Sequence, residues 1–515
     1  MEQSLWVLAM RQVDVLVIGS GPAGQRAAIQ AAKLGRSVAV VERTTMLGGV
    51  CINTGTIPSK ALREAILQLT GKRGRFYYEP AHGSSTNLTI QELVSQCQHI
   101  IRAEQSVILE HFQKNGITLL WGNAFFEDAH TVRVAHPTGS ELVQARESII
   151  LAVGTVPARP PHIPFDDCRV VDSDSFLRMP SLPRSLIIVG GGVIGTEYAC
   201  MMNALGVRVM LVEARPRLLD FVDEEISEAL QYHMRSADIT LRLGEKVSEV
   251  RVLSNGLVEA TLASGKHLRA EALLYCIGRQ GATATLGLET DSRGRIPVNE
   301  RFQTAIPHIY AVGDVVGFPA LASTSMEQGR VAACYACGEP VPPSCPLFPY
   351  GIYTIPEIAM VGKTEAQLTA EGVPYEVGVA HYREVARGQL LGDTRGMLKM
   401  LIHEQTREIL GVHAIGTGAT ELIHIGQLAI AFRATVDYFL QAIFNYPTLA
   451  ECYKVAALNG SNKLRLAPAR GAFPASGVRQ QVQFCCHECP PVRGKASGAL
   501  GAVRPDGGSR AVVRR

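Results

Sequence analysis

At 515 residues the chain is long enough for about three domains, and its 47% hydrophobic and 19% charged residues are typical of globular proteins with large cores. No apolar run reaches the roughly 18 residues of a membrane span, and the start lacks the basic segment of a secretory signal, so we expect neither; Met10 is an alternative start. The net charge of +3 includes ten Lys and Arg against two acids from Ser461 onwards, so the rest carries −5 and gives no reason to expect a nucleic-acid partner.

The first predicted element is a nucleotide-binding unit. Val13–Ile18 reads as a buried strand, Ala27–Leu34 as a helix, and a second strand over Ser37–Val41 ends on Glu42. Between the first strand and the helix lie the glycines of a G-x-G-x-x-G motif, Gly19, Gly21 and Gly24. Such glycines allow a tight turn, a close pyrophosphate and close helix packing, and the helix N-terminus attracts the phosphates. Glu42 follows the glycine motif at the sequence separation expected of a carboxylate that accepts hydrogen bonds from the adenosine ribose hydroxyls.

The same unit recurs in the middle of the chain. The stretch "RSLIIVGGGVIGTEYACMMNALGVRVMLVEA" carries Gly190, Gly192 and Gly195, and its acid is Glu213. A glycine motif that follows a strand, opens a helix and is closed by an acid at this distance is a strong signal for a dinucleotide. Two copies therefore predict two bound dinucleotides.

A third stretch, "HIYAVGDVVGFPALASTSMEQGRVAA", predicts a strand that ends at Gly313 and Asp314, followed by a helix. Taken alone, Asp314 reads most simply as a helix cap. Beside a flavin, the same carboxylate would hold ribityl hydroxyls.

These elements, in this order, resemble the pyridine nucleotide–disulfide oxidoreductase family. The resemblance runs from about Val13 to Leu464 and also rests on "GGVCINTGTIPSKAL", "AVGTVPARP" and "NYPTLAE". It implies an α/β fold with two Rossmann-like dinucleotide-binding domains and an α+β C-terminal dimerisation domain. The implied boundaries are 1–155 for the first part of the FAD domain, 156–279 for the NAD(P) domain, 280–345 for the return to the FAD domain and 346–464 for dimerisation. Residues 465–515 would form a disordered basic tail.

The resemblance also implies the site residues. Lys60 would lie beside flavin N5, paired with Glu197, where a cation favours the reduced flavin. The implied cofactor-binding residues are Gly19, Gly21, Gly24, Glu42, Arg43, Thr44, Thr45, Met46, Leu47, Gly48, Gly49, Val50, Cys51, Lys60, Ala124, Gly154, Gly190, Gly192, Gly195, Glu213, Arg215, Arg217, Gly278 and Asp314.

The chain departs from the family at two positions. Disulfide reductases of the family have C-x-x-x-x-C, whereas this chain has Cys51 and Thr56, and threonine cannot form a disulfide. The family's histidine base is replaced by Tyr446, whose ordinary pKa of about 10 is poorly suited to that role. With no disulfide to accept its electrons, the flavin would return the hydride to a second nicotinamide in a ping-pong cycle. This combination resembles the soluble transhydrogenase branch of the family, which implies FAD as cofactor and NAD(H) and NADP(H) as substrates.

Such an enzyme must accept both nicotinamide dinucleotides. Glu213 favours the free 2′-hydroxyl of NAD, because a carboxylate repels a 2′-phosphate. Arg215 and Arg217 follow it and could pair with that phosphate, or could be ordinary surface charges.

The remaining clusters carry no function in this interpretation. Cys334 and Cys337 read as core residues, His424 as structural, and the "CCHEC" run of the tail makes a poor tetrahedral metal site, so we expect no metal. The scattered cysteines favour reduced thiols in the cytoplasm. Two other functions stay open: an NAD(P)H-dependent reductase of another acceptor (a quinone, a metal ion or a dihydrolipoamide-like substrate), and a redox-sensing flavoprotein without enzymatic activity. A homodimer or higher homo-oligomer is expected, without nucleic-acid or membrane partners.

Overall fold

The computed structural model describes residues 10–43, 46–71, 90–179, 181–341 and 347–466. Within these ranges, no helix combines the length and the hydrophobicity that a membrane span needs. The tail from 467 to 515, including the "CCHEC" run, lies outside the described residues.

The first sheet is built around a strand that begins near the start of the chain. Its strand order is β3-β2-β1-β6-β5-β4, and β17 pairs with β6. The bounds are β1 (Arg11–Ile18), β2 (Val38–Glu42), β3 (Thr118–Trp121), β4 (Asn123–Phe126), β5 (Thr131–His136), β6 (Gly139–Leu151) and β17 (Ile309–Ala311). The pairings among β1, β2, β3, β6 and β17 are parallel, and β5 pairs antiparallel with β4 and β6. Because β17 comes late in the sequence, the chain returns to this sheet after completing the next one.

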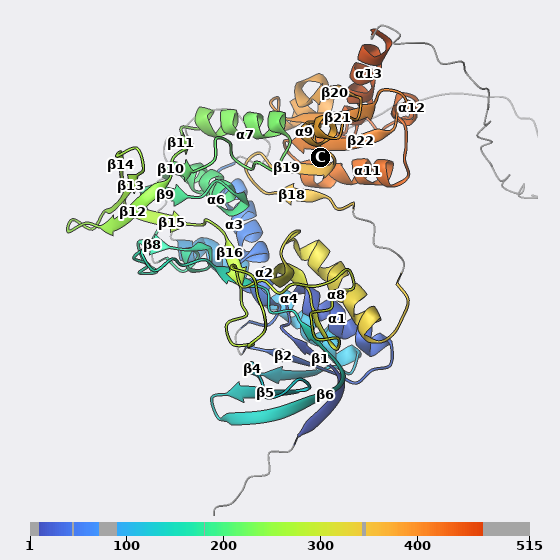
Figure 1. Cartoon of the computed structure of the whole chain (residues 1–515). Helices are drawn as coiled ribbons and strands as arrows, with labels where there is room; N and C mark the ends of the chain where they lie inside the picture. Colours follow the sequence, from blue (N-terminus) through green and yellow to red (C-terminus); the bar gives the residue numbers. More distant parts are fainter. Residues whose placement is uncertain (1–9, 44–45, 72–89, 180, 342–346, 467–515) are drawn as a thin grey trace, which may run out of the picture. The chain divides into compact units, whose positions relative to one another are not determined.

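Several helices and one 3₁₀ turn belong to the same part of the chain as the first sheet. The bounds are α1 (Pro22–Lys33), α2 (Gly49–Asn53), α3 (Thr56–Leu69), α4 (Ile90–Lys114), the 3₁₀ turn η1 (Gly313–Val316) and α8 (Ala322–Ala336). Helices α1 and α8 pack side by side (Figure 1). Gly329 of α8 touches the backbone of Ala23, where a Cβ would come within 2.1 Å of the carbonyl oxygen.

The second sheet repeats the arrangement of the first. Its order is β11-β10-β9-β15-β8 and all its pairings are parallel. The bounds are β8 (Val170–Val171), β9 (Ser185–Val189), β10 (Arg208–Glu213), β11 (Thr240–Leu243), β15 (Ala272–Tyr275), α5 (Ser173–Phe176), α6 (Val193–Ala204) and α7 (Glu224–Ser236). Beside it lie an antiparallel sheet of β12 (Val247–Val252), β13 (Val258–Leu262) and β14 (His267–Ala270), and the pair β7 (Thr155–Pro157) and β16 (Arg279–Gly281). In the first sheet β1 lies between β2 and β6, and in the second sheet β9 lies between β10 and β15. Each arrangement creates a switch point of the kind where nucleotides bind.

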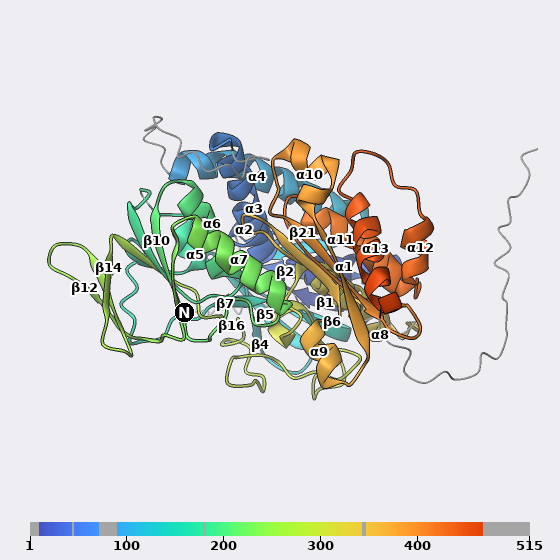
Figure 2. The ribbon, with the colours of Figure 1, turned by 90° about the horizontal axis from the view of Figure 1, so that it is seen from above.

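The third sheet is antiparallel, in the order β18-β19-β22-β21-β20. The bounds are β18 (Tyr350–Ile352), β19 (Ile358–Gly362), β20 (Tyr375–His381), β21 (Met397–His403), β22 (Ile409–Ile415), α9 (Glu365–Ala370), η2 (Tyr382–Glu384), α10 (Ala386–Leu391), α11 (Ala419–Ala431), α12 (Val436–Gln441) and α13 (Glu451–Leu466). Helices α11 and α13 pack against this sheet (Figure 2).

The predicted α/β class is confirmed, and the predicted elements differ mainly at their ends. Helix α1 begins at Pro22, earlier than the predicted Ala27, because proline suits the first turn of a helix and Gly21 precedes it in an extended conformation. The last helix runs to Leu466, two residues beyond the predicted end of the dimerisation domain.

Candidate functional site

The first glycine turn follows β1 and leaves room for a ligand. Gly19 has φ +104°, and a Cβ there would lie 2.4 Å from the carbonyl oxygen of Ala152 at the end of β6. A Cβ on Gly24 would lie 1.9 Å from the carbonyl oxygen of Gly19, so helix and turn pack as closely as the motif predicts. A Cβ on Gly21 would meet nothing within 4 Å, so its backbone borders open space at the start of α1.

Glu42 closes this turn from the end of β2. The backbone N–H and the hydroxyl of Ser20 both donate to its Oε2 at 2.7 Å, and the N–H of Arg43 donates to Oε1 at 2.7 Å. Burial raises the pKa of the Glu42 carboxyl, and these hydrogen bonds act in the opposite direction. A buried carboxylate with spare lone pairs is suited to ribose hydroxyls.

A cavity of about 420 Å³ begins at this turn. Its lining includes ten of the residues implied above as cofactor-binding: Gly19, Gly21, Glu42, Arg43, Gly49, Val50, Cys51, Ala124, Gly154 and Asp314. Nine of these residues lie at or beyond the ends of β1, β2 and β6, on α2 and on η1, around the switch point of the first sheet, and Ala124 lies on β4.

The donor and acceptor groups of this cavity fit FAD. Asp314 lines it, and burial raises the pKa of its carboxyl, although the Ser325 hydroxyl donates to it at 3.4 Å. A buried carboxyl that faces a cavity is suited to hydroxyl donors such as those of a ribityl chain. Gly21 and Glu42 supply the phosphate and ribose ends.

Several implied residues lie elsewhere. Leu47 is buried in the hydrophobic core, and Leu47, Met46 and Gly48 do not line the cavity. Gly48 has φ +86° and precedes α2, so it shapes the turn rather than the wall. Thr44 and Thr45 lie outside the described residues.

Lys60 and Glu197 form an ion pair, although they are 137 positions apart in the sequence. Lys60 Nζ on α3 lies 2.7 Å from Glu197 Oε2 on α6, whose side chain is only 5% exposed. The backbone N–H of Tyr353 donates to Glu197 Oε1 at 2.9 Å, and the Tyr353 ring lies 4.9 Å from Lys60 Nζ. The cation is therefore held from two sides. Tyr353 was not among the predicted site residues, because only the folded chain brings its N–H to Glu197, 156 positions away, and its ring to Lys60.

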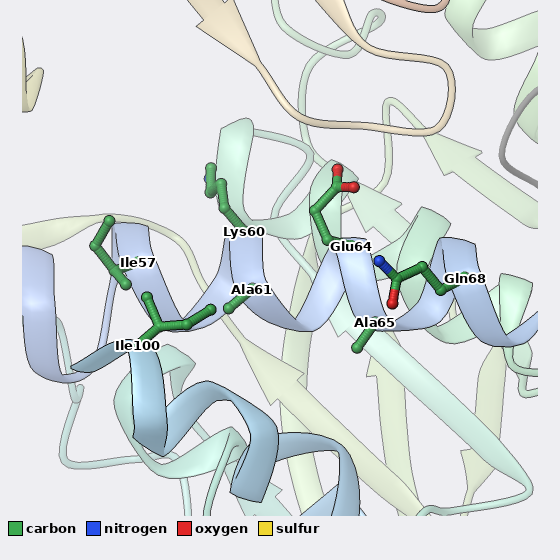
Figure 3. A pocket seen from close by; sticks show the side chains of 7 residues that line it. All are labelled: Ile57, Lys60, Ala61, Glu64, Ala65, Gln68 and Ile100. Atoms are coloured by element: carbon green, nitrogen blue, oxygen red, sulfur yellow. The ribbon is translucent and has the colours of Figure 1, made fainter. Parts of the chain in front are cut away.

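A second cavity of about 340 Å³ lies along α3. Its lining residues are Ile57, Lys60, Ala61, Glu64, Ala65, Gln68 and Ile100. Figure 3 shows Ile100 of α4 below the α3 side chains, with Lys60 and Glu64 extending from the other side of the helix.

Cys51 carries a neutral thiol and has no partner sulfur. It is a free cysteine on α2, half-buried, and burial raises its pKa, while a hydrogen bond with the Thr56 side chain acts in the opposite direction. None of the cysteines whose side chains the structure describes forms a disulfide. Cys334 is buried in α8, as expected for a core residue, and the His424 ring, on exposed helix surface, bonds only Gln427. Tyr446 is exposed and lines neither cavity.

The raised pKa of the Cys51 thiol can be tested by spectroscopy. Because the folded protein favours the protonated form, no thiolate should form at Cys51 as pH rises through the ordinary range of a thiol, about 8.5. The flavin absorbance of the oxidised protein should therefore stay constant between about pH 6 and pH 8.5. The Cys51→Ser spectrum should superimpose on it. A long-wavelength band that grows with pH and is lost in Cys51→Ser would contradict this account.

The second glycine turn follows β9 and has the geometry of the first. Gly190 has φ +115°, and a Cβ there would lie 2.7 Å from the carbonyl oxygen of Cys276 at the end of β15. A Cβ on Gly195 would lie 1.9 Å from the Gly190 carbonyl oxygen, and one on Gly192 would meet nothing within 4 Å. Gly278, with φ +123°, lies beyond β15 and also borders open space. This turn can therefore receive a second dinucleotide.

Glu213 closes the second turn, and its carboxylate already accepts hydrogen bonds from within the protein. The N–H of Gly191 donates to its Oε2 at 2.6 Å. The Arg215 backbone N–H and Nε donate to Oε1 at 2.9 and 3.0 Å, and Nη2 donates to Oε2 at 3.1 Å. Burial opposes ionisation, yet the Arg215 hydrogen bonds lower the pKa of Glu213. Arg217 forms an ion pair with Glu224 instead.

Comparisons with known proteins agree with this arrangement. Residues 13–329 match the family model described as pyridine nucleotide-disulphide oxidoreductase, and residues 348–457 match the dimerisation domain of the same family. A protein of Mycobacterium tuberculosis (strain ATCC 25177 / H37Ra), named soluble pyridine nucleotide transhydrogenase, is 52% identical over 462 residues, covering 88% of this chain and 98% of the relative. A protein of the same name from Escherichia coli O9:H4 (strain HS) is 44% identical over 463 residues, with the same coverage.

Two solved structures share the fold. LpdA from Mycobacterium tuberculosis has a TM-score of 0.78 and 24% identity, covering 87% of this chain and 99% of its own. The Cu(II) complex of RclA, a HOCl-induced flavoprotein disulfide reductase from Escherichia coli, has a TM-score of 0.78 and 26% identity, with the same coverage.

Proposed function

The chain belongs to the pyridine nucleotide–disulphide oxidoreductase family, and we propose that it is an FAD-dependent transhydrogenase that moves a hydride from NADPH to NAD⁺ in a ping-pong cycle. The observation that carries the proposal is the pairing of Cys51 with Thr56, where a disulfide reductase has a second cysteine. The names and high identity of the relatives support the same activity.

The chain's own residues would hold FAD in the larger cavity. Glu42 would receive the adenosine ribose, the start of α1 at Gly21 would receive the pyrophosphate, and Asp314 would receive the ribityl chain; all three residues line the cavity. Bound FAD supplies an atom, N5, that accepts a hydride from one nicotinamide and gives it to another.

Lys60 supplies a fixed positive charge. Glu197 and the Tyr353 ring hold the ammonium group in one position, so no side chain has to reorganise when negative charge develops nearby. The Tyr353 N–H in turn holds the Glu197 carboxylate.

The residues around Cys51 close the disulfide route of the family. Thr56 has no sulfur with which Cys51 could form a disulfide, and Tyr446 stands where the family has its histidine base. In the proposed ping-pong cycle the acceptor would therefore enter at the same place as the donor.

Both nicotinamide dinucleotides would bind at the second glycine turn. Glu213 would accept the 2′-hydroxyl of NAD, while Arg215 and Arg217 would face the 2′-phosphate of NADP. Sheet membership supports the domain boundaries stated above, since β17 completes the first sheet while β8, β9, β10, β11 and β15 form the second.

We further propose a cytoplasmic homodimer. The match of residues 348–457 to a dimerisation domain supports it, as do large apolar side chains exposed on this part of the chain, Leu428, Phe432, Tyr438 and Ile443. The cysteines whose side chains the structure describes form no disulfide, which is typical of a reducing compartment.

The proposal is tested by counting electrons. Under anaerobic titration with NADPH, the protein should take up one hydride equivalent per FAD, and it should then reduce a spectrally distinct NAD⁺ analogue in the presence of a thiol blocker. The Thr56→Cys variant is the matched control: a second sulfur beside Cys51 should let it take up a second equivalent. A second equivalent in the unmodified protein, or failure to reduce the analogue while a quinone is reduced, would refute the proposal.

A further inference from the structure

Arg215 is held between two carboxylates at the second glycine turn. On its inner side it binds Glu213, whose side chain is 8% exposed. On its outer side its Nη1 donates to Asp220 Oδ1 at 2.5 Å, and the side chains of Arg215 and Asp220 are 42% and 48% exposed. The guanidinium group therefore has a buried partner and a solvent-facing partner at once.

The backbone places Asp220 there by an unusual conformation. Leu219, directly before it, has φ +49°, a region that residues with a branched apolar side chain rarely adopt. The Leu219 N–H donates to the carbonyl oxygen of Gly191 at 3.2 Å, and the Leu218 and Leu219 side chains are fully buried. The segment that carries Asp220 is thus anchored on the glycine turn itself, and its position does not depend on the ion pair.

We infer that Asp220 is a specificity-determining residue, which withholds Arg215 from the 2′-phosphate of NADP and so keeps the site open to NAD. This inference rests on the proposed binding of both nucleotides at this turn. A 2′-phosphate needs the exposed Nη1 of Arg215, which Asp220 occupies. A 2′-hydroxyl needs only the lone pairs of Glu213, and Asp220 keeps a partner for Arg215 when its bonds to Glu213 are released.

The charges at the subsite favour the same conclusion. Glu213, Asp220 and Glu224 stand against Arg215 and Arg217, so carboxylates exceed cations by one. Removing the Asp220 charge would balance the subsite and leave the guanidinium group able to turn toward a phosphate dianion. Because Asp220 and Arg215 are both partly exposed, added salt should weaken the influence of the Asp220 charge on phosphate binding.

The experiment uses two fragments that differ only in the phosphate, 2′,5′-ADP and 5′-AMP, with the full-length FAD-loaded protein. Asp220→Asn should bind 2′,5′-ADP about fivefold more tightly, the size expected for a partly exposed charge, and bind 5′-AMP within about twofold of the unmodified protein. Asp220→Glu should restore the ratio of the two affinities seen in the unmodified protein. The gain in 2′,5′-ADP affinity of Asp220→Asn should be smaller at high salt.

Glu249→Gln is the matched control. Glu249 is 44% exposed and also lies 2.5 Å from an arginine, Arg251, but it stands on β12. The Glu249→Gln variant should bind 2′,5′-ADP and 5′-AMP as tightly as the unmodified protein does. Equal changes for both fragments, or no change in Asp220→Asn, would overturn the inference, while hydride exchange measured in the same variants tests the transhydrogenase proposal separately. Arg215→Ala should abolish the discrimination that Asp220→Asn enhances; if 2′,5′-ADP binds Arg215→Ala unimpaired, the inference also fails.

Discussion

Replacing Lys60 with methionine should slow hydride exchange between NADPH and NAD⁺ by about 10²- to 10³-fold, the usual cost of removing one preorganised group that stabilises developing charge. The variant loses the cation while keeping most of the side-chain volume, and it leaves the Glu197 carboxylate, 5% exposed, without its partner. Rapid-reaction kinetics of the NADPH half-reaction should show the loss in the rate constant for hydride transfer rather than in NADPH affinity.

Two controls separate charge from folding. Lys33→Met removes an exposed lysine at the end of α1 and should leave the rate unchanged. A Lys60→Met, Glu197→Gln double variant removes the buried charge as well, so it should recover thermal stability without recovering the rate. A Lys60→Met enzyme within about threefold of the unmodified rate would show that the ion pair is structural, given the losses typical of groups that act on developing charge.

Introducing valine at the last glycine of each motif should have different consequences in the two nucleotide-binding units. At Gly24 and at Gly195 alike, a Cβ would lie 1.9 Å from the carbonyl oxygen of the first glycine, so the steric damage is matched. Gly24→Val should yield protein without bound flavin. Gly195→Val should keep its yellow colour and show at least a 10²-fold loss in the rate of reduction by NADPH, because each displaced turn loses the helix N-terminus that binds a pyrophosphate.

The measurements are the flavin absorbance of each purified variant and the rate at which NADPH bleaches it. Circular dichroism establishes that both variants are folded. If Gly195→Val were purified without flavin and Gly24→Val retained it, the assignment of the two dinucleotides would be reversed.

Much of this molecule could be predicted because its nucleotide-binding units are local in sequence. Gly19 and Glu42, like Gly190 and Glu213, are close enough along the chain for spacing alone to specify strand, turn, helix and closing acid. The absence of a second sulfur at position 56, where the chain has Thr56, was also evident from the sequence alone. The Lys60–Glu197 pair, at a separation of 137 positions, was predicted only through the family resemblance, and the structure brings the two side chains together.

The sequence by itself determined which residue types are available: two glycine turns with their acids, one cysteine where a redox pair needs two, and a tyrosine in place of a base. The tertiary structure decided which of them are already engaged. The sequence left Arg215 as either a partner for a 2′-phosphate or an ordinary surface charge, whereas in the structure it is bound by Glu213 and Asp220. The physical reason is that Asp220 is positioned by a left-handed Leu219, a conformation with no local signal. The Leu218 side chain packs against Gly191 and the Leu219 N–H donates to the Gly191 carbonyl oxygen, and these contacts hold that conformation.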